Sequence, residues 1–175
     1  MELAGKTLGI IGFGRIGRAV GRIANAMGMN VLAYNRSRHP EGMAIGQYVN
    51  LDALLARADI VSLHCPLTKE NVGMINSAAI DKMKDGAILL NTARGGLLDE
   101  AAVAHALHSG KLRGAALDVV SQEPIVSENP LLTAPNCIIT PHMAWSPVES
   151  RQRILDCTVA SIQGFLSGKP IHTVN

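Results

Sequence analysis

The amino-acid sequence predicts a doubly wound α/β domain, in which helices cover both faces of a parallel sheet. Continuous apolar runs, typical of strands that are buried on both sides, alternate along the chain with helix-like segments. A glycine-rich turn directly follows the first apolar run and opens the first helix. The 175 residues are 47% hydrophobic and 17% charged, which is the composition of an ordinary globular domain.

The glycine-rich turn matches the G-x-G-x-x-G fingerprint of a dinucleotide-binding (Rossmann-type) βα unit. Gly12 permits the tight turn, Gly14 lets backbone approach a pyrophosphate, and Gly17 allows close packing of helix on strand. The predicted helix from Arg15 to about Met27 offers unpaired N–H groups and its positive dipole end to phosphates. Such turns also occur without a ligand, but a second strand at Asn30–Tyr34 favours dinucleotide binding.

The remaining elements follow from periodicity and from residues that begin or end helices. Asn50 is the expected N-cap of a short helix, and Gly110 follows the end of an alanine-rich one. Ser146-Pro147-Val148-Glu149 predicts a capping box with proline at the first helical position. The polar stretch 35–47 contains no predicted element. Helices are expected at Leu51–Ala56, Ser77–Met83, Glu100–Ser109 and from Ser146 to about Leu166, and strands at Asp59–Leu63, Ala87–Leu90, Ala115–Val120 and Cys137–Thr140.

Charge, composition and cysteine usage exclude several classes of partner. A net charge of +2 without a basic run, with only 3% aromatic residues, argues against nucleic-acid binding. No apolar run approaches the roughly 20 residues that span a bilayer, so no membrane partner is expected. Cys65, Cys137 and Cys157 have no metal-ligand spacing, so we expect reduced, buried thiols in a cytoplasmic protein and no metal site. His39, His105, His108 and His172 are expected on the surface.

Ligands of such sheets bind beyond the carboxyl ends of the strands, where this sequence places an arginine, a carboxylate and a histidine. These are Arg94, Glu123 and His142. Hydride transfer between a nicotinamide and a 2-hydroxy acid needs these three groups. The histidine moves the hydroxyl proton, the carboxylate orients the histidine, and the arginine binds the acid. Each residue has a plainer interpretation, as a solvated turn arginine, an exposed loop acid and a strand-end histidine. Asp118 has the alternative role of a turn acceptor.

Four ordered motifs resemble those of the D-2-hydroxyacid dehydrogenases: the glycine turn, Asn91–Gly96, Leu117–Val119 with Gln122–Pro124, and Thr140–His142. The resemblance implies that Arg94 binds the substrate carboxylate and carbonyl, that His142 is the general acid/base, and that Glu123 is its partner. It also implies that Asp118 contacts the nicotinamide amide and that backbone near His64 lines the cofactor. The expected cofactor-binding residues are Gly12, Gly14, Arg15, Ile16, Gly17, Asn35, Arg36, Ser37, His64, Cys65, Pro66, Thr92, Ala93, Asp118 and His142. Residues His142–Trp145 most resemble glycerate dehydrogenases (hydroxypyruvate reductases).

The end of the second predicted strand bears on the choice of nicotinamide cofactor. NAD-binding folds normally carry an acid there that accepts hydrogen bonds from the adenosine ribose. Asn35 stands at this place, followed by Arg36, Ser37 and Arg38. Loss of the carboxylate removes repulsion of a 2′-phosphate, and Arg36 offers a charged donor to it. NADP(H) is therefore the expected cofactor, with NAD(H) the alternative if the arginines are ordinary loop charges.

The resemblance also predicts how the chain is organised. We expect a dinucleotide-binding domain at residues 1–167 and, at 168–175, a segment that returns to a substrate domain, most of which would precede residue 1. This implies nucleotide binding with poor turnover of a small 2-keto or 2-hydroxy acid such as hydroxypyruvate or glyoxylate. The alternative is a module that senses NAD(P)(H) without turnover. Resemblance further implies a homodimer formed through this domain, near Glu100–Ser109.

Overall fold

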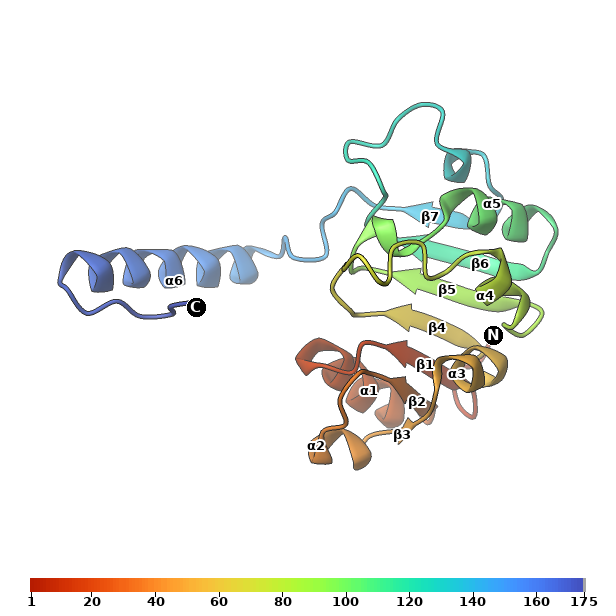
Figure 1. Cartoon of the computed structure of the whole chain (residues 1–175), viewed down its shortest axis with the longest axis horizontal. Helices are drawn as coiled ribbons and strands as arrows, with labels where there is room; N and C mark the ends of the chain where they lie inside the picture. The colour runs from red at the N-terminus through yellow and green to blue at the C-terminus, as the bar shows by residue number, and fades with distance from the viewer. Residues whose placement is uncertain (175) are drawn as a thin grey trace. The chain divides into compact units, whose positions relative to one another are not determined.

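Seven parallel strands form one sheet in residues 1–174, the part of the chain that the computed structural model describes (Figure 1). The strand order is β3-β2-β1-β4-β5-β6-β7, so the chain winds outward from β1 in both directions. This order confirms the predicted doubly wound α/β fold. The strands are β1 (Thr7–Ile11), β2 (Asn30–Tyr34), β3 (Gln47–Tyr48), β4 (Ile60–Leu63), β5 (Ala87–Asn91), β6 (Leu112–Leu117) and β7 (Cys137–Ile139).

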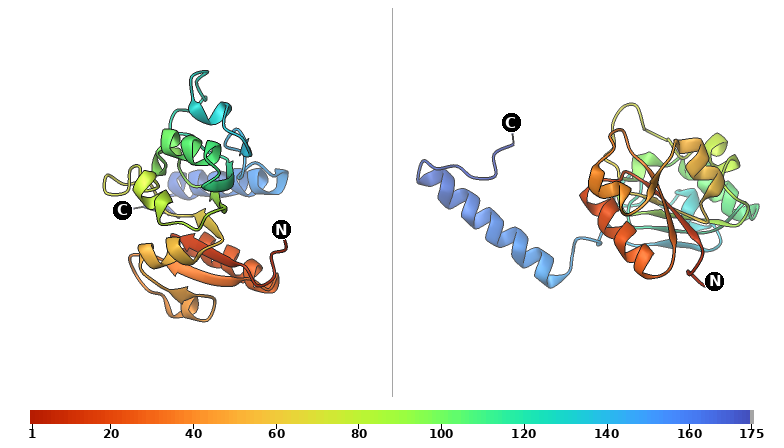
Figure 2. Two further views of the ribbon diagram at one scale, coloured as in Figure 1. Left: turned by 90° about the vertical axis from the view of Figure 1, so that its right-hand side faces the viewer. Right: turned by 90° about the horizontal axis from the view of Figure 1, so that it is seen from below.

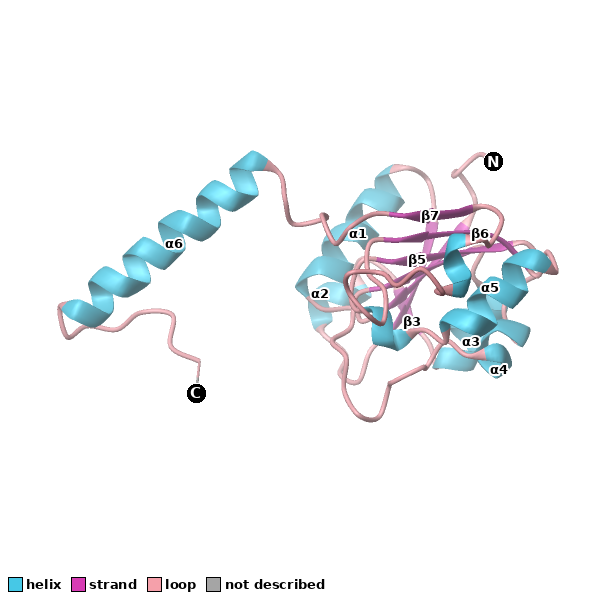
Figure 3. Ribbon diagram, turned by 90° about the horizontal axis from the view of Figure 1, so that it is seen from above, coloured by secondary structure: helices cyan, strands magenta, loops and turns pink. Residues whose placement is uncertain are grey.

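Helices cover both faces of this sheet. Figure 3 shows α1 on one side of the strands and α3, α4 and α5 on the other. Asn50 caps α3 as predicted, because its Oδ1 accepts a hydrogen bond from Ala53 N at 2.8 Å. The helices of the first compact unit, which ends at Pro141, are α1 (Arg15–Ala26), α2 (Pro40–Met43), α3 (Leu51–Arg57), α4 (Ser77–Asp81) and α5 (Glu100–His108), with 3-10 turns η1 (Gly95–Leu97) and η2 (Pro130–Leu132).

The hydrophobic core consists of two clusters, one on each face of the sheet. The larger cluster joins the strands to α3, α4 and α5 through side chains such as Leu54, Ile80 and Val103. The smaller one packs α1 on the other face around Phe13, whose ring meets Tyr48 edge-on at a centroid distance of 5.6 Å. Burial on both faces explains why the central strands are continuous apolar runs.

Several predicted boundaries are wrong. β6 begins at Leu112 and ends at Leu117, three residues earlier at each end than predicted, because it pairs with β5 from Ala87 onward. The polar stretch 35–47 contains α2 and the first residue of β3, a two-residue strand that extends the sheet beside β2. α4 ends at Asp81.

The second compact unit begins at His142 and contains α6 (Val148–Leu166), a single helix (Figure 2). The predicted capping box is wrong, since Pro147 is the N-cap and no side chain caps the helix. No residue of α6 is buried, so the expected burial of Cys157 is also wrong. After α6 the chain folds back, with Lys169 N donating to Gly164 O at 2.8 Å. The expected relation of residues 168–175 to a substrate domain stays a prediction.

Candidate functional site

The glycine turn is held tightly against the end of β4. Gly12 has a φ of +94°, and a Cβ there would lie 2.5 Å from Cys65 N. A Cβ on Gly17 would lie 2.3 Å from Gly12 O, so helix α1 also packs closely on the turn. Gly14 differs from both, because a Cβ there would meet no atom within 4 Å. The turn therefore presents backbone to open space at Gly14, which close approach of a phosphate requires.

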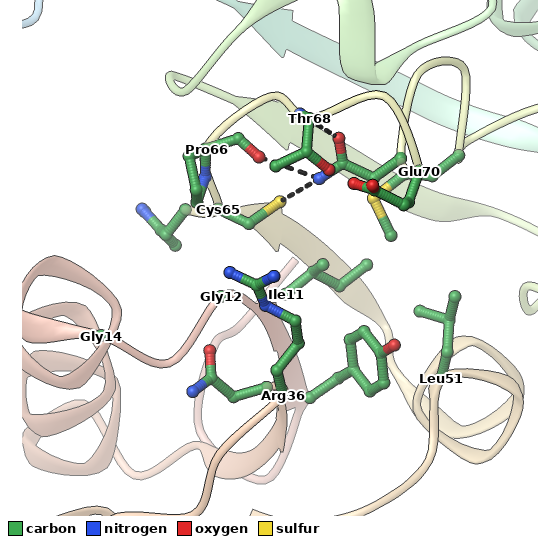
Figure 4. Close-up of a pocket in the computed structure, with 14 residues that line it drawn as sticks. Ile11, Gly12, Gly14, Arg36, Leu51, Cys65, Pro66, Thr68 and Glu70 are labelled. Carbon is green, nitrogen blue, oxygen red and sulfur yellow. Dashed lines mark hydrogen bonds between the residues drawn. The ribbon is translucent and has the colours of Figure 1, made fainter.

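A cavity of about 450 Å³ lies beside this turn, at the carboxyl ends of β1, β2 and β4. Figure 4 shows its walls, with Gly12 and Arg36 on one side and Thr68 and Glu70 on the other. A position beyond the strand ends is where ligands of doubly wound sheets bind. The lining residues are Ile11, Gly12, Gly14, Tyr34, Asn35, Arg36, Leu51, His64, Cys65, Pro66, Thr68, Glu70, Asn71 and Met74.

Asn35 connects the glycine turn to the end of β2. Its Oδ1 accepts a hydrogen bond from Phe13 N at 3.1 Å, and its Nδ2 donates to Ser37 O at 2.8 Å. The side chain at this position is thus a neutral amide that braces two loops. Because residue 35 is an asparagine, it carries no negative charge that would repel an anion in this part of the cavity.

Arg36 extends its guanidinium into the cavity toward Cys65 (Figure 4). Glu70 lines the same cavity on the opposite wall. A hydrogen bond from the Thr68 side chain, with a smaller contribution from the charge of Arg36, lowers the pKa of the Glu70 carboxyl. The cavity therefore contains an arginine that is attracted to a carboxylate across it, and an anionic ligand would compete for that arginine.

The end of β4 contributes a neutral wall. His64 is half-buried, and its Nε2 lies 2.9 Å from Ser62 Oγ. Burial lowers the pKa of its imidazole. Burial likewise raises the pKa of the Cys65 thiol. The imidazole and the thiol are therefore uncharged at neutral pH, and Asn71 Nδ2 ties the following loop to Pro66 O at 2.8 Å.

The turn after β5 holds Arg94 through its backbone. Asn91 is fully buried, its Oδ1 accepts from Ala93 N at 3.0 Å, and its Nδ2 donates to Arg94 O at 2.9 Å. The Arg94 side chain is exposed and its Nη1 donates to Ala93 O at 2.6 Å. A fixed backbone with an exposed guanidinium suits an arginine that binds a carboxylate.

Two acids follow β6. Asp118 is 5% exposed, and its Oδ1 accepts a hydrogen bond from Thr140 Oγ1 at 2.6 Å, which links the ends of β6 and β7. Glu123 is exposed, and its Oε1 accepts from Val120 N at 3.3 Å. His142 is half-buried and begins the second unit, with a φ of 51°.

Seven of the predicted cofactor-binding residues line the cavity: Gly12, Gly14, Asn35, Arg36, His64, Cys65 and Pro66. The other eight, Arg15, Ile16, Gly17, Ser37, Thr92, Ala93, Asp118 and His142, are not among its lining residues. The binding roles of all fifteen residues stay predictions. Sequence reasoning missed seven lining residues: Ile11, Tyr34, Leu51, Thr68, Glu70, Asn71 and Met74. The one signal for the residues after position 66 is Pro66, which lies in the loop that follows β4.

The model of the D-isomer specific 2-hydroxyacid dehydrogenase NAD binding domain matches residues 1–144. The chain belongs to this family. Its part in that family is the NAD-binding domain, so the cavity beside the glycine turn lies in a domain that binds a nicotinamide cofactor.

Individual relatives agree with this assignment. A hydroxypyruvate reductase of Blautia hydrogenotrophica is 52% identical over 176 residues, covering 100% of this chain and 55% of the relative. A glycerate dehydrogenase of Methylorubrum extorquens is 44% identical, covering 99% of this chain and 54% of the relative. The crystal structure of a Lactobacillus jensenii D-lactate dehydrogenase with NAD+ superposes with a TM-score of 0.93 at 35% identity, over 100% of this chain and 57% of that one.

The chain thus spans about half the length of the curated relatives that it matches. Among residues 1–174, no helix is long and apolar enough to cross a membrane. Within the same residues no cluster of three histidine, cysteine or acidic side chains could hold a metal ion.

Proposed function

We propose that this domain serves an oxidoreductase that uses NADP(H) in preference to NAD(H) and reduces a small 2-keto acid such as hydroxypyruvate or glyoxylate. The observation that carries the cofactor preference is the pairing of a neutral Asn35 with an arginine that extends into the cavity. The family and the hydroxypyruvate reductase relative support the substrate class.

The residues of the cavity fit a dinucleotide. The open space beside Gly14 and the N-terminus of α1 suit a pyrophosphate, since both bring backbone N–H groups to it. A 2′-phosphate would gain a charge-assisted contact with Arg36 and meet no carboxylate at residue 35. Arg36 would then exchange its attraction to Glu70 for the phosphate.

The nicotinamide supplies the hydride when the cofactor is bound. Arg94 would bind the carboxylate of the keto acid and polarise its carbonyl, for which its exposed guanidinium is available. His142 would donate the proton to the oxygen that becomes the hydroxyl, and Glu123 would orient and stabilise its charged form. Asp118 would accept a hydrogen bond from the nicotinamide amide while keeping its link to Thr140.

The cofactor preference is tested by measuring dissociation constants of NADPH and NADH for the chain and two variants. Arg36→Ala should weaken NADPH by about tenfold or more, and leave NADH within about twofold, because only the phosphate loses a charged partner. Arg38→Ala is the matched control, since it removes the same charge from the same loop at a residue that does not line the cavity. Tighter binding of NADH than of NADPH by the unaltered chain would contradict the preference.

Turnover is tested by following NADPH consumption with hydroxypyruvate and glyoxylate. The full natural polypeptide should reduce at least one of them, and the 175 residues alone should bind NADPH but turn over poorly, because one side of the site would be open to water. Nucleotide binding without reduction of any 2-keto acid by the full polypeptide would favour the alternative, a module that senses NAD(P)(H). Robust turnover by the 175 residues would show that our expectation of a substrate domain elsewhere is wrong.

We also propose that the domain forms a homodimer in the cytoplasm, with the surface near α5 as the interface. α5 presents few apolar side chains to solvent, because Val103 and Leu107 are turned into the core. The contact would therefore use flanking segments as well. A solution mass equal to one chain would count against the dimer.

A further inference from the structure

The segment that carries Arg94 and the loop that carries Glu123 contact each other at two points. We name residues 118–129 the Glu123 loop. The first contact is at Gly95, where a Cβ would lie 1.9 Å from Val120 C and 2.4 Å from Ser121 N. These are backbone atoms, so the two segments touch backbone to backbone and only glycine fits at residue 95. The turn after β5 is thus pressed directly against the Glu123 loop.

The second contact is made by Glu100, the first residue of α5. Its Oε1 accepts a hydrogen bond from Ser121 N at 2.6 Å. Its Oε2 accepts from Ser121 Oγ and from Asn129 Nδ2, each at 2.8 Å. One carboxylate therefore accepts three hydrogen bonds from the Glu123 loop, two from Ser121 before Glu123 and one from Asn129 after it.

These bonds are of the stronger kind, because the acceptor is charged and the distances are short. Asn129 is 5% exposed, so its amide would lose a partner in a buried place if the carboxylate were removed. The side-chain oxygen of Asn129 also has a partner, since Oδ1 accepts a hydrogen bond from Leu131 N at 3.0 Å. The loop is thus attached to α5 at Ser121 and to both α5 and η2 at Asn129.

We infer that Glu100 is a positioning residue, which fixes the Glu123 loop against the turn of Arg94 so that the two proposed catalytic side chains keep a constant separation. This inference rests on the proposed function. Glu123 belongs to this loop and is joined to its backbone, since its Oε1 accepts a hydrogen bond from Val120 N at 3.3 Å. The loop, rather than a direct bond from Glu100, is what transmits the constraint.

A plainer role for Glu100 would be stabilisation of α5, because a negative charge in the first helical turn is favourable. Side-chain length separates the two roles. Glu100→Asp keeps the charge at the helix end but is shorter by one methylene, so it cannot reach all three donors. Ser121→Ala is the matched variant on the other side, since it removes one of the three bonds and leaves α5 unchanged.

The test is hydroxypyruvate reduction by the full natural polypeptide, with NADPH affinity and thermal stability measured on the same samples. Glu100→Ala should lower kcat roughly tenfold, because loss of loop position misaligns the proton-transfer partner. KM for hydroxypyruvate should change less than kcat, since the Arg94 turn is also held by Asn91. NADPH affinity should stay unchanged. Glu100→Asp should resemble Glu100→Ala, and Glu100→Gln, which keeps one acceptor oxygen at full length, should restore part of kcat.

The outcomes separate the two proposals. If the unaltered polypeptide reduces no 2-keto acid, the proposed function fails and this inference fails with it. If it is active and Glu100→Ala loses stability while kcat stays normal, only the inference is overturned. If Glu100→Ala does not fold, Ser121→Ala is the variant that tests the inference. Its kcat should fall by about twofold to fivefold. A normal kcat in Ser121→Ala would then overturn the inference.

Discussion

Alanine substitutions at Gly17 and Gly14 should separate the structural role of the glycine turn from its role in binding. At Gly17 the added methyl would lie 2.3 Å from Gly12 O, whereas an ordinary carbon–oxygen contact is about 3.3 Å or longer. Helix α1 must therefore move from the turn by about 1 Å, which typically costs about 1–3 kcal/mol in a packed interior. Alanine regains about 1 kcal/mol through its higher helix propensity. At the middle of that range we expect a net loss of about 1 kcal/mol, or a fall in Tm of roughly 3 °C.

At Gly14 the same methyl meets no atom within 4 Å, and the residue has a φ of −78°, which alanine adopts readily. The loss of a favourable N-cap residue and the lower entropy of the unfolded chain oppose each other, so stability should change by less than about 0.5 kcal/mol. The methyl would, however, stand where the backbone is open to a pyrophosphate. Gly14→Ala should therefore weaken NADPH and NADH alike, by about tenfold or more.

Urea unfolding and fluorescence titration with both nucleotides would measure these effects on the unaltered chain and the two variants. The expected pattern is opposite for the two substitutions: Gly17→Ala loses stability first, and Gly14→Ala loses affinity at nearly normal stability. The reasoning is refuted if Gly14→Ala binds both nucleotides normally, or if Gly17→Ala is as stable as the unaltered chain.

Three further predictions concern stability. Burial lowers the pKa of His64, so the contribution of this residue to the free energy of unfolding should be complete above the ordinary pKa of 6.5. That contribution should be lost as pH falls through the lower folded pKa, at up to about 1.4 kcal/mol per pH unit. Urea unfolding of His64→Gln should lack this dependence on pH. Burial raises the pKa of Asp59, but hydrogen bonds from Lys84 and Thr7 N outweigh it and leave the pKa lowered. Asp59→Asn should therefore cost about 1 kcal/mol at neutral pH, an effect that fades as pH falls below the ordinary 3.8; an undiminished difference in acid would contradict this. Asn50→Ala should cost about 1 kcal/mol through loss of the α3 cap, measured as a change in urea midpoint.

The sequence by itself determined the fold and the family. Continuous apolar strands, the glycine turn and the Asn50 cap depend on neighbouring residues only, and the structure confirms each of them as a feature of the fold. Neighbouring residues in the sequence also marked the strand ends. Those ends placed Asn35, Arg36 and His64, which line one cavity. Parallel strands bring their carboxyl ends to one edge, so order along the chain was enough to group these residues.

Only the tertiary structure decided features that depend on partners far along the chain. The ends of β6 are set by pairing with β5, and β3 exists because two residues pair with β2. The far wall of the cavity comes from the loop that contains Thr68 and Glu70, in which no periodicity marks a ligand site. Glu100 accepts hydrogen bonds from donors 21 and 29 residues away, and an acid at the start of a helix does not by itself predict such contacts. Local patterns record which face of an element is buried, whereas hydrogen bonds between loops depend on where the folded chain places them.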